Sequence, residues 1–207
     1  MTRFETEEQQ VEALKRWWKE NGTAVIIGVV LAVGALGGWR GWSWYQASRA
    51  FDASDAYAVV HGLLQQGDAR SFEMQAEALR DRFASSPYAV LTALQEAKMH
   101  AAKGDLPASA ESLDWVIRHS EQKPVRDIAR LRLARVLLAD DKPDDAYAVI
   151  DREFPGTFVS LAHEIRGDIL VAKGELEQAR REYDEAMKSG QAVGVEFLQM
   201  KRNDLGN

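Results

Sequence analysis

The chain has 207 residues, of which 46% are hydrophobic and 28% charged, a composition typical of a folded protein rather than a disordered one. Its 32 acidic and 26 basic side chains give a net charge of −6, which argues against a general nucleic-acid-binding surface. The sequence contains no cysteine, which excludes disulfides, thiolate metal sites and a cysteine nucleophile.

Residues 1–20 carry the pattern of a short amphipathic helix. Val11, Leu14 and Trp18 stand at helical spacing, with Trp17 adjacent. Such a helix is expected to lie on the membrane surface, where its apolar face is buried among the lipids. A cytoplasmic partner protein could use the same face instead.

Residues 21–45 are predicted to form a single, uncleaved transmembrane helix. Asn21 to Trp39 is a run of 19 uncharged residues, roughly 28 Å of helix, which is close to the thickness of the hydrocarbon core of a bilayer. Tryptophans flank the run on both sides, as expected at two membrane interfaces; they are Trp17, Trp18, Trp39, Trp42 and Trp44. A buried soluble helix explains this pattern less well, and a cleaved signal peptide would need a shorter apolar stretch and a small-residue cleavage site.

The charges beside the predicted span indicate its orientation. Lys15, Arg16 and Lys19 precede it, whereas only Arg40 and Arg49 follow closely. Because positive residues favour the cytoplasmic side, residues 1–20 are expected in the cytoplasm and residues 46–207 across the membrane.

Small residues recur along the predicted span. Glycines in small-xxx-small spacing allow a second membrane helix to approach closely, so they form a candidate packing face; these are Gly28, Gly34, Gly37, Gly38 and Gly41. The same residues are also common in membrane helices that pack against nothing.

Residues 46–207 are predicted to be all helical, with a fixed repeat. Gly67, Gly104 and Asp141 stand 37 residues apart and Gly174 follows 33 later, each in a sequence typical of a turn. Pro87 and Pro124, also 37 apart, fit the first turn of a helix.

The spacing around these turns resembles the tetratricopeptide repeat, a pair of antiparallel helices of about 34 residues. Around the turns at Gly104, Asp141 and Gly174, a small residue stands seven positions before the turn (Ala97, Ala134, Gly167). Another small residue stands five positions after it (Ser109, Ala146, Ala179). A bulky residue stands nine positions after it (Leu113, Ile150, Tyr183). The first unit fits badly, since Val60 and Phe72 occupy positions expected to be small. The predicted fold is therefore all-α, a single N-terminal transmembrane helix followed by a tetratricopeptide-like solenoid, with a generic helical bundle as the alternative.

A solenoid of this kind leaves a concave surface lined by the first helix of each repeat. The repeat register places six residues on that candidate binding surface: Leu94, Lys98, Leu131, Arg135, Glu164 and Asp168. Residues from Val193 to Leu205 are expected to form a last helix that covers the final repeat.

No catalytic or metal-binding pattern accompanies the repeats. The four histidines stand singly in the sequence, without a second ligand at helical spacing. Nucleophile-elbow, P-loop and dinucleotide-binding motifs do not occur. The sequence therefore predicts a protein that is not an enzyme, with no cofactor and no metal.

Four stretches resemble the YfgM family, the ancillary subunit of the bacterial SecYEG translocon. They are QVEALKRWWKENG before the span, LRLARV at 131–136, RGDILVAKGELEQAR at 166–180 and MKRNDL at 200–205. The resemblance implies an inner-membrane protein with a cytoplasmic N-terminus and a periplasmic repeat domain. It also implies association with the translocon and a membrane-anchored periplasmic prolyl isomerase, transfer of unfolded client chains to periplasmic chaperones, and a cytoplasmic regulator at residues 1–20. An assembly factor for another envelope complex, for example in cytochrome maturation, and an accessory subunit of a membrane enzyme remain the rival functions.

Overall fold

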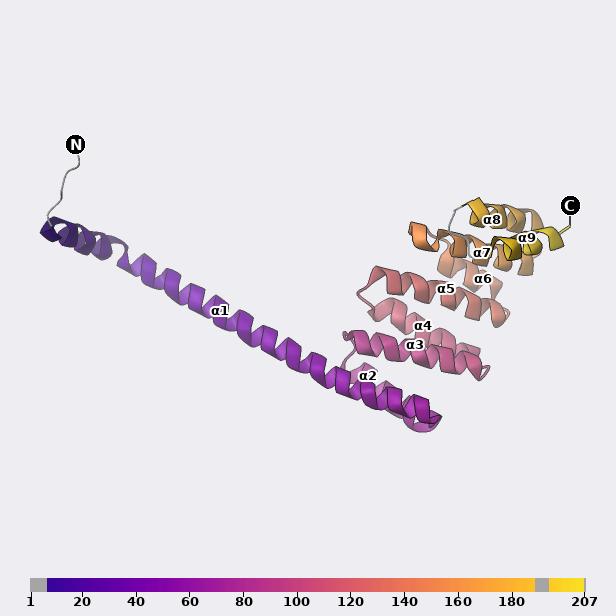
Figure 1. The fold of residues 1–207 in the computed structure, drawn as a ribbon, viewed down its shortest axis with the longest axis horizontal. Coiled ribbons are helices and arrows are strands. Elements are labelled where there is room, and N and C mark those ends of the chain that lie inside the picture. Colours follow the sequence, from indigo (N-terminus) through magenta and orange to yellow (C-terminus); the bar gives the residue numbers. More distant parts are fainter. Residues whose placement is uncertain (1–6, 189–193, 207) are drawn as a thin grey trace. The chain divides into compact units, whose positions relative to one another are not determined.

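The computed structural model describes residues 7–188 and 194–206, and within these ranges it contains nine helices and no strand (Figure 1). It divides into two compact units, Met1–Phe51 and Asp52–Asn207. The predicted all-α class is confirmed. Residues 1–6 of the predicted N-terminal segment lie outside the described residues.

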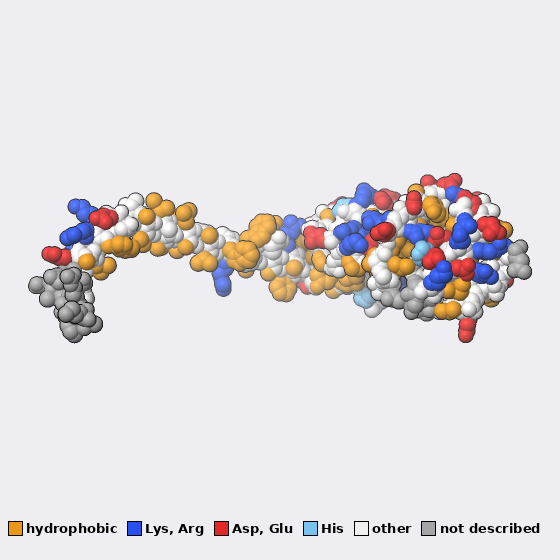
Figure 2. All heavy atoms as spheres, turned by 90° about the horizontal axis from the view of Figure 1, so that it is seen from above, with side chains coloured by type: hydrophobic (Ala, Val, Ile, Leu, Met, Phe, Trp, Pro, Cys, Tyr) orange, Lys and Arg blue, Asp and Glu red, His pale blue; other side chains and the backbone are white. Residues whose placement is uncertain are grey.

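Helix α1 (Glu7–Gln66) contains the predicted span and is long and apolar enough to cross a membrane. Its large apolar side chains from Ile26 to Leu36 are exposed. Figure 2 shows hydrophobic side chains along much of residues 10–51, whereas red and blue charged side chains are spread over the described part of residues 52–206. A soluble surface rarely exposes such a continuous apolar area, so lipid is the environment that suits this segment.

Residues 52–207 form successive helix pairs followed by one terminal helix (Figure 1). Residues 52–66 of α1 pair with α2 (Ala69–Arg82). The next pairs are α3 (Pro87–Ala102) with α4 (Leu106–His119), α5 (Lys123–Ala139) with α6 (Pro143–Ile150), and α7 (Gly156–Ala172) with α8 (Leu176–Lys188); α9 (Val195–Asp204) follows.

The four predicted turns join the two helices of each pair. Gly67, Gly104 and Gly174 have φ values of 75°, 80° and 76°, and Asp141 has 56°. These are left-handed conformations, which reverse the chain after a helix and which glycine adopts without strain. In the first two turns the next residue, an aspartate, caps the following helix, as Asp68 does by accepting a hydrogen bond from Ser71 N at 3.1 Å.

The predicted close contacts between paired helices are also present. All nine residues of the repeat register are buried, and Gly167 on α7 shows why small residues are needed there. A Cβ atom at Gly167 would lie only 2.7 Å from Cδ1 of Tyr183, well inside van der Waals contact. In the first pair Val60 and Phe72 take the equivalent positions and are themselves buried, so this pair keeps the register with larger side chains in its core.

Helix α9 covers the end of the repeat array. Leu198 packs with Tyr183 and Ala186 of α8 in a small core. The last helix was expected from Val193, which lies outside the described residues; the described helix begins at Val195.

A candidate binding surface on the repeat domain

The first helix of each pair supplies the candidate binding surface, and the structure brings three of its six predicted residues to one groove. Leu94 and Lys98 of α3 and Arg135 of α5 line a cavity of about 560 Å³, here called the α3–α5 groove. The α4 residues Ser109 and Leu113 close its floor.

The α3–α5 groove combines apolar and basic side chains. Its apolar part consists of Leu91, Leu94, Leu113 and Val136, and the side chains with charge are Lys98, Arg132 and Arg135. Its lining contains no carboxylate. Arg132 was not predicted, although it lies on the same helix as Arg135 and three residues before it, which places the two side chains on one face.

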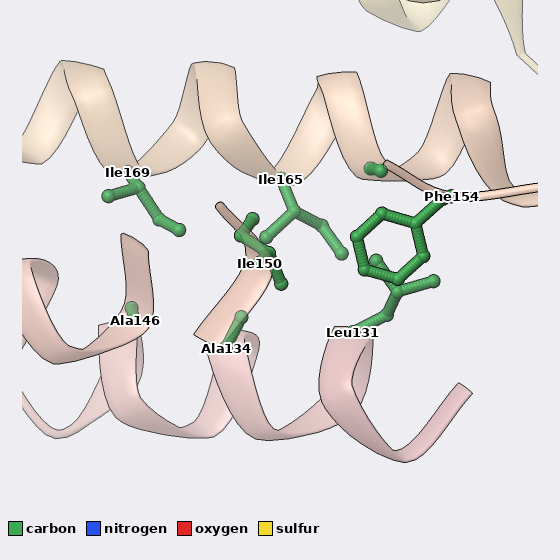
Figure 3. Close-up of a cluster of buried hydrophobic side chains, with 8 residues drawn as sticks. Leu131, Ala134, Ala146, Ile150, Phe154, Ile165 and Ile169 are labelled. Carbon is green, nitrogen blue, oxygen red and sulfur yellow. The ribbon is translucent and has the colours of Figure 1, made fainter. Parts of the chain in front are cut away.

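Leu131 does not belong to this surface, and its predicted exposure is wrong. It is only 2% exposed and packs in a core with Ala134, Ile150 and Ile165. Figure 3 shows Phe154, from the segment between α6 and α7, beside Leu131. Because α6 is only 8 residues long, the chain after it returns over α5 and covers the position that the repeat register leaves open.

Glu164 and Asp168 lie on α7, as predicted, but both carboxylates already form ion pairs with Lys201. Lys201 Nζ of α9 is 3.0 Å from Glu164 Oε1 and 2.8 Å from Asp168 Oδ1. Arg135 Nη2 approaches Glu164 Oε1 at 3.6 Å. These two carboxylates are therefore part of an internal network and offer little free negative charge to a partner.

Tyr183 completes the network around Asp168. Its hydroxyl donates a hydrogen bond to Asp168 Oδ1 at 2.8 Å, and its ring is the group that Gly167 accommodates. Burial, together with the neighbouring carboxylate, raises the pKa of the Tyr183 phenol far above its usual range. Tyr183 stays protonated and acts as a donor that holds Asp168 in place.

The first pair contributes two residues that the sequence reasoning missed. Tyr57 and His61 stand at the same offsets from Val60 as Leu94 and Lys98 do from Ala97. Gln95 Nε2 donates to Tyr57 Oη at 3.0 Å, and the His61 and Tyr57 rings stack with centroids 5.8 Å apart. Applying the repeat register to the poorly fitting first unit would have found both.

A buried acid lies on another side of α3. Glu96 is 4% exposed, and its Oε2 is 3.1 Å from Arg80 Nε of α2. Burial raises the pKa of the Glu96 carboxyl from 4.5 to about 7, and the Arg80 charge opposes only part of that rise. Glu96 does not line the α3–α5 groove, so we assign it to the packing of α3 against α2.

The glycines of the predicted packing face lie on the exposed surface of α1. A Cβ atom at Gly28, Gly34, Gly37, Gly38 or Gly41 would have no heavy atom within 4 Å beyond its own helix backbone. The face is therefore sterically open, and its role in packing against a partner helix stays a prediction.

Within the described ranges, no group of three or more histidine, aspartate or glutamate side chains is placed to hold a metal ion. His163, for example, is paired with Glu182, with Nδ1 and Oε2 2.7 Å apart. What the described surface offers is a groove for binding.

Nearly the whole chain is similar to known proteins that share one name. Residues 15–207 match the family model described as a tetratricopeptide repeat-like domain. The "Ancillary SecYEG translocon subunit" of Haemophilus influenzae is 32% identical over 96% of this chain and 97% of its own length. The protein of that name from Escherichia coli is 32% identical over 98% of this chain and 98% of its own length. The one from Neisseria gonorrhoeae is 31% identical over 96% of this chain and 97% of its own length. No solved structure matches the chain significantly.

Proposed function

This chain belongs to the family of ancillary SecYEG translocon subunits, and from that membership we propose that it is a membrane-anchored, non-catalytic adaptor of the translocon. The observation that carries the proposal is the similarity to the Escherichia coli relative, 32% identity over 98% of both chains. One helix able to cross a membrane, followed by a repeat-like domain, fits a single-pass membrane protein that works by binding.

The proposed location is the bacterial inner membrane, with residues 1–20 in the cytoplasm, residues 21–45 in the bilayer and residues 46–207 in the periplasm. The cluster of Lys15, Arg16 and Lys19 before the span supports this orientation. Anchoring would raise the effective concentration of the repeat domain beside the exit of the translocon.

The proposed role is to receive emerging, unfolded chains and pass them to periplasmic chaperones, beside a membrane-anchored prolyl isomerase. A stack of helix pairs supports this role because it presents an extended surface without needing a reaction centre. Residues 1–20 are proposed to meet a cytoplasmic regulator.

Co-purification of the full chain from membranes in mild detergent tests the adaptor role. Subunits of SecYEG are expected in the eluate, and a variant whose residues 21–45 are replaced by an unrelated span separates tethering from recognition. Recovery of a cytochrome-maturation complex or another envelope enzyme, without SecYEG, would assign the chain to one of the rival functions.

Protease treatment of spheroplasts tests the topology. The repeat domain should be digested while a tag at the N-terminus survives. Survival of the repeat domain until the inner membrane is broken would reverse the orientation.

A further inference from the structure

We infer that the α3–α5 groove binds an extended segment of a partner protein that carries both apolar and acidic side chains. This inference rests on the proposed adaptor function and specifies the chemistry of one of its partners. Three features support it, namely two cations of the groove without carboxylate partners, its apolar floor and the mixed charges of the other cavity of similar volume.

Two of the three cations of the groove, Lys98 and Arg132, lack a carboxylate partner among the described residues. Among the residues that the structure describes, Lys98 and Arg132 form no ion pair and no side-chain hydrogen bond, and Arg135 reaches only Glu164, at 3.6 Å. Glu164 is bound more closely by Lys201, at 3.0 Å. Three positive charges thus converge on one groove of a protein with a net charge of −6. Carboxylates of a partner are the groups that would neutralise them.

The apolar floor selects against a purely acidic ligand. Leu91 is 44% exposed, and it lies with Leu94 in both the groove and an adjoining cavity of about 250 Å³ that extends to Pro87 and Val125. From Pro87 to Ala101, α3 measures about 21 Å, a length that about six residues of an extended chain would cover. Apolar side chains of such a segment would bury the exposed leucine surface.

Another cavity of similar volume lacks this character. Between α6, α7 and α8 a cavity of about 550 Å³ is lined by side chains of both charges, which are Asp151, Arg152, Glu153, His163, Arg166 and Glu182. There Arg166 Nη2 donates to Ile150 O at 2.9 Å, and His163 is paired with Glu182. Because carboxylates lie beside the arginines in that cavity but are absent from the lining of the α3–α5 groove, the groove is the stronger docking site for an acidic segment.

The test measures binding of fluorescently labelled hexapeptides to the full-length protein in detergent micelles. The probe alternates leucine with glutamate, and its matched control replaces each glutamate with glutamine. We expect the acidic probe to bind at least tenfold more tightly than the amide control, with an affinity that falls as salt rises.

Charge reversal in the groove locates the site. Lys98→Glu and Arg132→Glu should each weaken the acidic probe by about tenfold, whereas Arg181→Glu, the same change at an exposed position on α8, should leave its affinity within twofold. Leu91→Ser should weaken the acidic and amide probes alike, because it changes only the apolar floor.

Three results would overturn the inference. They are equal affinity for the two probes, equal loss in Arg181→Glu and the groove variants, and binding to vesicles of anionic lipid that the acidic probe does not compete. Co-purification of SecYEG is scored separately with the same variants. Loss of probe binding with SecYEG retained supports a groove partner other than the translocon, whereas absence of SecYEG from the wild-type eluate refutes the proposed function alone.

Discussion

At the scale of single residues, replacing Gly167 or Gly62 by alanine is predicted to change the free energy of unfolding in opposite directions. Gly167→Ala should lower the free energy of unfolding by about 1–3 kcal/mol, because the added methyl group collides with the ring of Tyr183. Gly62→Ala should raise it by about 0.5–1 kcal/mol, since its nearest neighbour would be the flexible Gln66 side chain at 3.9 Å and alanine favours a helix. Urea unfolding followed by circular dichroism measures both; an unchanged or increased stability of Gly167→Ala would mean that the close contact between α7 and α8 is absent.

The raised pKa of Glu96 predicts a pH dependence. The folded protein keeps a proton on this carboxyl up to about pH 7, whereas the unfolded chain releases it near the ordinary value of 4.5. The contribution of Glu96 to stability is therefore complete below about pH 4.5 and decreases as pH rises to 7. The neighbouring acids Glu73, Glu77 and Glu111 add to the effect, and Arg80 opposes it.

The variant Glu96→Gln tests this dependence, because its side chain stays neutral throughout. Relative to the variant, the wild-type protein should lose stability between pH 5 and pH 7, by an amount on the order of a few kcal/mol. Unfolding free energies measured at both pH values give the difference. Parallel pH profiles for the two proteins would contradict a raised pKa at Glu96.

At the scale of elements, α9 is predicted to stabilise the last repeat more through Lys201 than through Arg202. Lys201 bridges Glu164 and Asp168 in a setting where all three side chains are at most 25% exposed. Lys201→Met should cost about 1–2 kcal/mol, because it leaves two carboxylates close together without their cation. Arg202→Met should cost less than about 1 kcal/mol, since its pair with Asp184 is largely solvated. Equal changes in thermal midpoint for Lys201→Met and Arg202→Met would contradict a special role for Lys201.

Much of the repeat architecture could be predicted from the sequence because its determinants are local and recur. A left-handed turn needs glycine or a tolerant residue such as Asp141, and a close helix contact needs a small residue such as Gly167, so both leave a fixed period. The first pair was recognised poorly because Val60 and Phe72 fill the same positions with larger side chains.

The binding surface could be predicted only in part, because it depends on contacts between distant segments. The cover of Leu131 by Phe154 follows from the short α6 and the path of the chain after it, which helical periodicity does not encode. The pairing of Lys201 with Glu164 joins residues 37 positions apart. Tyr57 and His61, by contrast, lay within reach of the repeat register.

At the scale of the whole molecule, substitutions on the glycine face of the span test whether the span only tethers the protein or also recognises a partner helix. The double variant Gly34→Leu with Gly38→Leu should stay in the membrane fraction, because leucine keeps the segment apolar and a Cβ atom at either position has no described neighbour within 4 Å beyond its own helix backbone. If this face packs on a partner helix, SecYEG recovery should fall several-fold.

The matched control places leucines on the same helix without removing a glycine. Val29→Leu with Val33→Leu, at two exposed positions, should leave SecYEG recovery unchanged. Unchanged recovery in the glycine variant as well would move the contact to residues 46–207.

The ion pairs between Lys201 and α7 can form only after α9 has been synthesised. Lys201 is made 33 residues after Asp168, a delay of about 2–7 s at ordinary rates of protein synthesis. Throughout that interval the carboxylates of α7 have been made, while the lysine that neutralises them has not. The fourth helix pair therefore cannot complete this ion-pair network until α9 has been made.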